Sequence, residues 1–217
     1  MADDAVVTLT IDGQTVQAKD GEKILWAALD AGIDIPHLCA IREATPPLGT
    51  CRLCFVEVEG KGVVPSCIEP IEEGMVVHTD GERAQALRKR AMELLLADHP
   101  MNCKDCVKKG KCDFLTLAVS MKVKRPKNLR PFPREELAID DSHPSIVFDP
   151  NKCILCGRCI WVCEKEVSLV PLAFSHRGYR MRLSTFLGEP LAKTDCTGCA
   201  VCTEVCPTAA LCRKGEE

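Results

Sequence analysis

The chain has 217 residues and a formal net charge of −3, with only 4% aromatic residues but 16 cysteines. This balance gives no global attraction to nucleic acid, and no apolar run approaches the roughly 20 residues needed to cross a bilayer. The N-terminal MADDAVVTLT lacks the basic and apolar segments of a signal peptide, so we expect a cytoplasmic protein. In a cytoplasmic chain, this many cysteines favours metal binding over disulfides.

Residues 1–80 predict a small domain with a sheet and one helix. VVTLTI and QTVQA read as two strands joined at Asp12-Gly13, a dipeptide suited to a hairpin turn. The apolar stripe in EKILWAALDAG predicts a helix that ends at Gly32. Strands are expected again in FVEV and MVVHTD. The order of hairpin, helix, cysteine-bearing loop and returning strands indicates a β-grasp domain, the scaffold of two-iron ferredoxins.

The cysteines of this domain are suited to one [2Fe–2S] cluster. The four predicted ligands are Cys39, Cys51, Cys54 and Cys67. Their spacing departs from the C-x4-C-x2-C run of plant-type ferredoxins. A four-cysteine zinc site is the alternative, because four thiolates with one C-x2-C knuckle would serve zinc equally well. The redox modules that follow in the chain favour the iron cluster.

Residues 82–98 form the clearest predicted helix. One face is expected to carry Ala84, Leu87, Ala91, Leu94 and Leu95, whereas Arg88, Lys89 and Arg90 lie largely off it. Pro100 restricts the residue before it and ends the helix there.

A run of one histidine and three cysteines follows this helix, in residues 81–120. Its spacing is H-x3-C-x2-C-x5-C, formed by His99, Cys103, Cys106 and Cys112. Three thiolates leave a four-iron cube one ligand short, and a neutral imidazole can fill the fourth place. The alternative for His99 is a helix-end residue that only hydrogen-bonds a carbonyl, but the three cysteines favour ligation. The remaining histidines are not followed by such a run of cysteines, and we expect them to be ordinary polar or structural residues. They are His37, His78, His143 and His176.

Residues 121–143 contain the basic, proline-rich KVKRPKNLRPFPREE, which predicts an extended connector. The basic run lacks a recognisable nucleic-acid-binding fold or regular aromatic interleaving, so we expect no nucleic-acid partner.

Residues 144–217 carry two copies of C-x2-C-x2-C-x3-C, CILCGRCIWVC and CTGCAVCTEVC. In such pairs three cysteines hold one [4Fe–4S] cube and the fourth ligates the other cube. The predicted ligand sets are therefore Cys153, Cys156, Cys159 and Cys206 for one cube, and Cys163, Cys196, Cys199 and Cys202 for the other. The insert between the motifs is expected to form strands or a hairpin. Cys212 stands outside these sets and is expected to pack as a small apolar residue.

This order of motifs resembles three related iron–sulfur regions. They are the N-terminal region of the large peripheral-arm subunit of respiratory complex I, the small diaphorase subunit of NAD-linked bidirectional hydrogenases, and the N-terminal half of iron-only hydrogenases. The stretch with one histidine and three cysteines is the most specific part of the resemblance. We expect an α+β protein of the diaphorase type, without the iron-only hydrogenase or molybdopterin-type domains that follow in the other two relatives.

The resemblance implies an electron relay with no catalytic residues of its own. Single electrons would pass between a flavin-bearing, NAD(P)H-oxidising partner and a catalytic partner such as a hydrogenase or formate dehydrogenase. No dinucleotide fingerprint, P-loop or nucleophile elbow is found, so we expect no nicotinamide or flavin site on this chain. Two alternatives remain: a free-standing polyferredoxin that carries electrons between enzymes, and a zinc-held interaction scaffold. One [2Fe–2S] and three [4Fe–4S] clusters are the expected cofactors.

Overall fold

The structure is a computed structural model that describes residues 5–128 and 136–215. The chain divides into two compact units, Met1–Met92 and Glu93–Glu217, and the boundary falls inside helix α2 (Glu82–Asp98). Part of the predicted connector, residues 129–135, lies outside the described residues. In the described ranges no helix combines the length and the apolar character that crossing a membrane requires.

A five-stranded mixed sheet organises the first unit. Its strands lie in the order β2-β1-β5-β3-β4. Their bounds are β1 Val6–Ile11, β2 Gln14–Lys19, β3 Phe55–Val58, β4 Gly62–Pro65 and β5 Val76–His78. The predicted hairpin is confirmed: β1 pairs antiparallel with β2, and the turn residues Asp12 and Gly13 both have positive φ. Strand β4 was not foreseen from the sequence.

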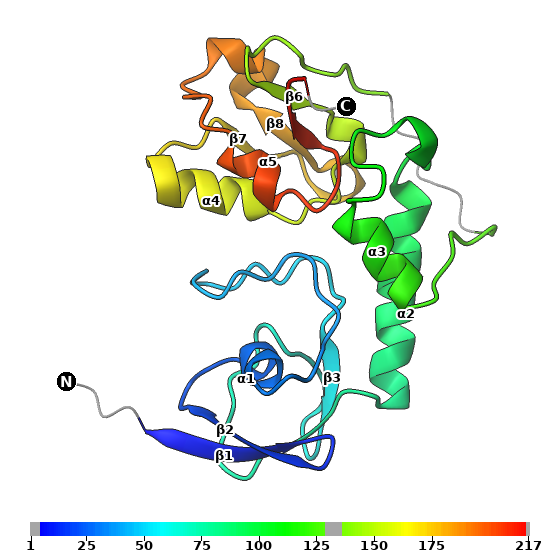
Figure 1. The fold of residues 1–217 in the computed structure, drawn as a ribbon, viewed down its shortest axis with the longest axis vertical. Coiled ribbons are helices and arrows are strands. Elements are labelled where there is room, and N and C mark those ends of the chain that lie inside the picture. Colours follow the sequence, from blue (N-terminus) through cyan, green and yellow to red (C-terminus); the bar gives the residue numbers. More distant parts are fainter. Residues whose placement is uncertain (1–4, 129–135, 216–217) are drawn as a thin grey trace. The chain divides into compact units, whose positions relative to one another are not determined.

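Helix α1 (Ile24–Asp30) follows the hairpin and lies beside the sheet (Figure 1). The predicted helix ends as expected, because Gly32 adopts a left-handed φ of 77° just beyond it. The core between helix and sheet is mostly aliphatic, with Leu9, Leu25 and Val77 at 1% exposure or less.

The bounds predicted for helix α2 are confirmed, but its predicted apolar face is buried only in part. Leu87 is 44% exposed and Leu94 is 55% exposed. The buried stripe instead follows an i, i+4 spacing through Ala84, Arg88, Met92 and Leu96, with Arg88 only 7% exposed. The apolar pattern predicts that Arg88 lies off the buried face, whereas its side chain turns inward to a backbone carbonyl.

The start of α2 is held by β3. Glu57 Oε1 accepts hydrogen bonds from the amides of Arg83 and Ala84, at 2.8 and 3.2 Å. These amides belong to the first turn, where helical N–H groups lack intrahelical acceptors and a negative charge is favourable. A Cβ atom at Gly81 would lie 2.3 Å from Glu57 Oε1, so the glycine makes room for this cap.

Short elements and loops build the second unit. The helices are α3 Asp113–Ser120, α4 Arg158–Val167 and α5 Val201–Val205. Strand β6 (Ile146–Phe148) pairs antiparallel with β9 (Leu211–Arg213). The expected hairpin in the insert is confirmed as β7 (Leu172–Ser175) and β8 (Arg182–Thr185). Figure 1 shows α4 and α5 next to these strands. The core of this unit includes cysteines as well as aliphatic side chains.

Candidate metal centres

Four buried cysteines gather in the first unit. Cys39 and Cys51 lie in the loop after α1, Cys54 directly precedes β3, and Cys67 follows β4. All four are at most 4% exposed. The backbone amide of Cys51 donates a hydrogen bond to Cys39 Sγ at 3.4 Å. The fold therefore brings the four sequence-predicted residues of this set into one buried region.

The electrostatics of these thiols reflect how close they are. Hydrogen bonds from the Cys51 and Cys67 thiols lower the pKa of the Cys39 thiol. A hydrogen bond from Cys67 lowers the pKa of Cys54 to about 7. Thiolates are the form in which cysteine binds metal, and a cation among them would favour that form. The donor set thus fits a thiolate-bound iron–sulfur group.

Arg52, between two of these cysteines, adopts a left-handed φ of 58°. Residues other than glycine adopt this conformation rarely, and it is found at functional sites more often than elsewhere. A left-handed residue in a tight loop turns successive backbone N–H groups toward one concave space, which is a known way to hold phosphates and iron–sulfur groups.

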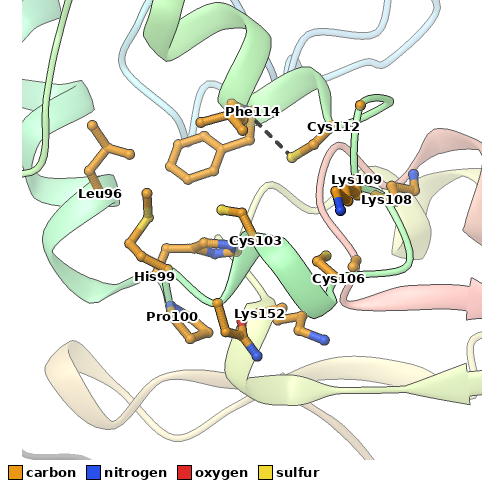
Figure 2. Close-up of a pocket in the computed structure, with 15 residues that line it drawn as sticks. Leu96, His99, Pro100, Cys103, Cys106, Lys108, Lys109, Cys112, Phe114 and Lys152 are labelled. Atoms are coloured by element: carbon orange, nitrogen blue, oxygen red, sulfur yellow. Dashed lines mark hydrogen bonds between the residues drawn. The ribbon is translucent and has the colours of Figure 1, made fainter.

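A second cluster of candidate ligands lines a cavity of about 70 Å³ in the second unit. His99, Cys103, Cys106 and Cys112 all contribute to its wall, and Figure 2 shows their side chains around the cavity with Phe114 beside them. His99 is the residue directly after α2. Cys112 caps the start of α3, because its Sγ accepts a hydrogen bond from the Leu115 amide at 3.5 Å. The four sequence-predicted residues of this run are therefore brought together.

The imidazole of His99 is neutral near neutral pH. Burial lowers the pKa of His99 to about 4, and the positive charge of Lys152 acts in the same direction. Its Nδ1 atom is buried and has no hydrogen-bond partner among the described residues. The ring packs edge-on against Phe114, with centroids 5.1 Å apart. A neutral ring with a buried, unpartnered nitrogen fits the place of a metal ligand.

Hydrogen bonds join the segment that carries Cys103, Cys106 and Cys112 to the second C-x2-C-x2-C-x3-C motif and the residue after it. The Phe114 amide donates to the carbonyl oxygen of Pro207 at 3.1 Å. Lys108, which also lines the cavity, donates from Nζ to the carbonyl oxygen of Cys206 at 2.5 Å. The residue after Cys206 and the carbonyl of Cys206 itself are therefore fixed against the loop that carries Cys106 and Cys112.

The two copies of C-x2-C-x2-C-x3-C share one backbone conformation. In the first copy Leu155 and Gly157 have φ values of 56° and 81°. In the second, Gly198 and Ala200 occupy the same two positions, with φ values of 75° and 62°. Helices α4 and α5 begin directly after Gly157 and Ala200. The repeated left-handed pair forms concave, amide-lined loops of the same kind as the loop at Arg52.

Each predicted set of the paired motifs lines its own small cavity. Cys153, Cys156, Cys159 and Cys206 line a cavity of about 10 Å³. Cys163, Cys196, Cys199 and Cys202 line another, of about 20 Å³. Cys159 lines both cavities. The fourth cysteine of each run therefore lies with the first three of the other run, as the sequence predicts.

The thiols of Cys156 and Cys202 are protonated in the absence of a cation. Burial raises the pKa of Cys156 and of Cys202 to about 12, and neighbouring cysteines add to both shifts. The amide of Leu155 donates to Cys153 Sγ at 3.4 Å, and such hydrogen bonds to sulfur also tune iron–sulfur groups. Among the described residues, no group of three or more acidic, histidine or cysteine side chains is placed to hold a single metal ion. A polynuclear cluster differs from one ion because its ligands surround a larger inorganic core.

The other residues singled out from the sequence lie apart from these cavities. His37 Nδ1 lies 2.8 Å from the carbonyl oxygen of Ile35, and His78 Nε2 lies 3.2 Å from Glu59 Oε1. His143 is 6% exposed, and its Nδ1 accepts the Ser145 amide at 3.1 Å. Cys212 is buried in β9, as expected for a small apolar residue.

Sequence reasoning missed two features of these sites. The first is the buried position of Arg88, whose Nε donates to the carbonyl oxygen of Phe55, the residue after Cys54. An i, i+4 reading from Ala84 to Met92 would have placed Arg88 on the buried stripe. The second is the left-handed conformation of Leu155 and Ala200, for which the residue types give no signal.

Comparison with known protein families identifies three segments. Residues 4–82 match a 2Fe-2S iron-sulfur cluster binding domain. Residues 88–127 match the NADH-ubiquinone oxidoreductase-G iron-sulfur binding region, and residues 145–167 match a 4Fe-4S binding domain. The chain therefore contains a 2Fe–2S domain and 4Fe–4S binding regions in a mixed α/β fold.

Several characterised proteins are similar over nearly the whole chain. The NADP-reducing hydrogenase subunit HndD of Solidesulfovibrio fructosivorans is 37% identical over 95% of this chain. One subunit of an NADH-quinone oxidoreductase of Rhizobium meliloti is 33% identical over 95% of it. The NADPH-Fe(3+) oxidoreductase subunit alpha of Geobacter sulfurreducens is 34% identical over 96% of it. The chain spans 36% of the first relative's length and 24% of each of the other two.

Among solved structures, one chain of an NAD+-reducing [NiFe]-hydrogenase in the H2-reduced state superposes with a TM-score of 0.87. It is 33% identical, and the match covers 97% of this chain and 88% of that chain. The similarity therefore extends over both units and over nearly the full length of the hydrogenase chain.

Proposed function

The protein belongs to the same family of iron–sulfur subunits as the matched chain of the NAD+-reducing [NiFe]-hydrogenase. From this premise we propose that it relays single electrons within a larger oxidoreductase. The donor or acceptor at one end is a flavin-containing, NAD(P)H-oxidising subunit. At the other end is a catalytic subunit such as a hydrogenase or a formate dehydrogenase. We propose that the chain has no nucleic-acid partner, does not insert into a membrane directly, and works in the cytoplasm.

We propose four clusters, each held by four side chains. A [2Fe–2S] cluster lies in a β-grasp domain (1–80), a [4Fe–4S] cluster in a small helical module (81–120), and two more in a ferredoxin-like domain (144–217) after the connector (121–143). The proposed ligands are Cys39, Cys51, Cys54 and Cys67 for the two-iron cluster; His99, Cys103, Cys106 and Cys112 for the first cube; Cys153, Cys156, Cys159 and Cys206 for the second; and Cys163, Cys196, Cys199 and Cys202 for the third.

The observation that carries this proposal is that three separate cavities of the second unit each gather one complete predicted ligand set. A single active site would not need several redox groups in a chain of 23.8 kDa. Electron tunnelling weakens steeply with distance, so closely spaced groups are what a relay requires. The hydrogen bonds from Phe114 and Lys108 to Pro207 and Cys206 support a short path between the His99 site and the paired motifs.

Exposed apolar side chains favour a fixed subunit over the free-standing polyferredoxin. Tyr179 lies in the loop between β7 and β8 and is 56% exposed. Phe186 and Leu187 directly follow β8 and are 81% and 85% exposed. We propose that these side chains belong to a surface that contacts another protein, as large exposed apolar patches do.

Metal and sulfide analysis of the anaerobically purified chain tests the proposal. We expect about 14 irons per chain, from one two-iron and three four-iron clusters, with matching acid-labile sulfide. Reduction with dithionite should bleach the visible absorbance and produce EPR signals of both cluster types. A colourless chain that contains zinc instead of iron would support the interaction scaffold and contradict the relay.

Variants of His99 test the most distinctive ligand. The His99→Cys variant should keep its cube and lower the reduction potential of that cube, because a thiolate adds negative charge where the imidazole was neutral. The His99→Ala variant should perturb one four-iron EPR signal and leave the others unchanged. The control is His176→Ala, which removes an exposed histidine and should change no signal. Unchanged spectra of His99→Ala would show that His99 is not a ligand.

A further inference from the structure

The first unit buries one cation beside its cysteine site. Among the described residues, Arg88 is the only arginine or lysine that is buried, with 7% exposure. Its side chain comes from the inward stripe of α2, between Ala84 and Met92. A buried guanidinium loses most of its hydration, which costs several kcal/mol unless other groups compensate.

The hydrogen bonds of Arg88 compensate the loss of hydration of its guanidinium only in part. Arg88 Nε donates to the carbonyl oxygen of Phe55 at 2.6 Å, which satisfies one of its five N–H groups. The Nη2 atom is also buried and has no hydrogen-bond partner among the described residues. A native protein rarely leaves such a group without a partner, so a missing counter-charge is expected nearby.

The hydrogen bond to Phe55 brings the guanidinium to the strand that begins directly after Cys54. Burial lowers the pKa of Arg88, and the charge of Cys54 is the strongest influence that opposes this shift, ahead of Asp12 and Asp34. The carbonyl that holds Arg88 belongs to Phe55, which directly follows Cys54. The guanidinium is therefore hydrogen-bonded to the residue that directly follows a proposed ligand.

We propose that Arg88 is the counter-charge of the two-iron site and a positioning residue that raises the reduction potential of that site. The inference rests on the proposed function, because it requires a two-iron cluster on Cys39, Cys51, Cys54 and Cys67. Four thiolates and two sulfides outweigh the charge of the irons, so the site is anionic. A two-iron cluster held there would become more anionic on accepting one electron, from dithionite in the test below, and no bond would form or break. A fixed, desolvated cation stabilises the reduced form more than the oxidised form.

EPR-monitored redox titration of the full chain, with dithionite as reductant, tests this role. Replacing Arg88 with methionine keeps an unbranched, mostly apolar side chain but removes the charge. We expect the Arg88→Met variant to shift the two-iron signal to a lower midpoint potential and to leave the four-iron signals unchanged. Arg88→Lys keeps a cation and should stay closer to the wild type. The matched control is Lys89→Met, which removes an exposed cation from the next position of the same helix and should cause no shift.

Ionic strength separates a buried charge from a surface charge. Salt screens charges that face solvent and screens buried pairs much less. The difference between wild type and Arg88→Met should therefore persist when the titration is repeated at high salt. A difference that disappears in salt would contradict the proposal.

A second neutral variant keeps the test decisive if Arg88→Met does not fold. Arg88→Gln keeps an amide that can donate to the carbonyl oxygen of Phe55. Unshifted two-iron potentials in Arg88→Met and Arg88→Gln would overturn the inference and leave the proposed function intact. Loss of the two-iron signal from both neutral variants, with its retention in Arg88→Lys, supports the need for a cation, whereas loss from all three variants contradicts it. If the wild-type chain has no two-iron signal, the proposed function fails and the inference fails with it.

Discussion

The two units surround their candidate ligands with different material. In the first unit Cys54 and Cys67 belong to a large core that is otherwise made mostly of aliphatic side chains such as Leu9, Ile24 and Leu25. In the second unit Cys159 and Cys206 belong to a smaller core, and further cysteines pack against it. Burial also differs, because Cys199 is exposed while all four cysteines of the first unit are buried. The first unit therefore has a large apolar core in which the candidate ligands are a small part, whereas candidate ligands make up a larger share of the core of the second unit and its border.

Removal of iron should break this comparison most visibly. Metal binding contributes directly to folding free energy where ligands make up the core. After anaerobic chelation we expect amides of α4 and α5 to lose protection from hydrogen exchange by about a hundredfold or more, equal to about 3 kcal/mol. Amides of β1 and β2 should keep most of theirs. Exchange followed by mass spectrometry measures both segments in one sample, and equal losses in the two units would refute the distinction.

A substitution in the apolar core of the first unit should sharpen the same comparison. Leu25 is fully buried in the first unit, and Leu25→Ala should lower the free energy of unfolding of that unit by about 2–5 kcal/mol. Chemical denaturation followed by the two-iron absorbance measures the effect. The control Val6→Ala removes a side chain that is 62% exposed and should change stability by less than about 0.5 kcal/mol. A loss as small as that of the control would mean that the cluster rather than the apolar core holds this unit together.

Oxidative damage should follow the difference in burial. Cys199 is exposed, so oxidants reach the proposed cluster of the Cys163 set more easily than the buried two-iron site. During timed exposure to ferricyanide we expect a four-iron EPR signal to decay first, several-fold faster than the two-iron signal. If the two-iron signal decays first, burial of the ligands does not control access to these sites.

Replacing Asp140, a carboxylate of the second unit, should give the smallest change in stability. Asp140 Oδ2 accepts the Leu191 amide at 2.6 Å and Oδ1 accepts the Ser142 amide at 3.0 Å. Burial raises the pKa of Asp140, but the hydrogen bonds from Ser142 and Leu191 outweigh burial and hold the pKa below its ordinary value. We expect Asp140→Asn to cost about 1 kcal/mol, because hydrogen bonds to a charged acceptor are stronger than those to an amide.

The pH dependence of this effect has a defined sign. A carboxyl group whose folded pKa is lowered contributes stability above its unfolded pKa of roughly 3.9, and this stability is lost as pH falls through the lower folded value. The difference between wild type and Asp140→Asn should therefore stay constant from about pH 8 to about pH 5. A difference that shrinks within that window would show that the pKa of Asp140 is not lowered.

Local patterns predicted the elements better than they predicted what each element buries. The Asp12-Gly13 turn and the start and end of α2 follow from residue types with strong backbone preferences, and both were predicted correctly. The inward face of α2 was not, because an arginine is not expected in a core, and only the fold shows that Arg88 donates to a backbone carbonyl there. The grouping of ligands followed from cysteine spacing alone. The left-handed φ of Leu155 did not, since it depends on the loop that surrounds the site.

The exchange of fourth cysteines between the paired motifs has a consequence for biosynthesis. Cys206 lines the cavity of Cys153, Cys156 and Cys159, so under the proposed ligand sets that cube stays incomplete until the ribosome has translated the second motif. Neither copy is a finished binding unit during its own synthesis. Under these ligand sets, delivery of iron and sulfide to this domain would wait until both motifs have been synthesised, and a product stalled inside the β7–β8 hairpin would hold thiols that cannot close either cube.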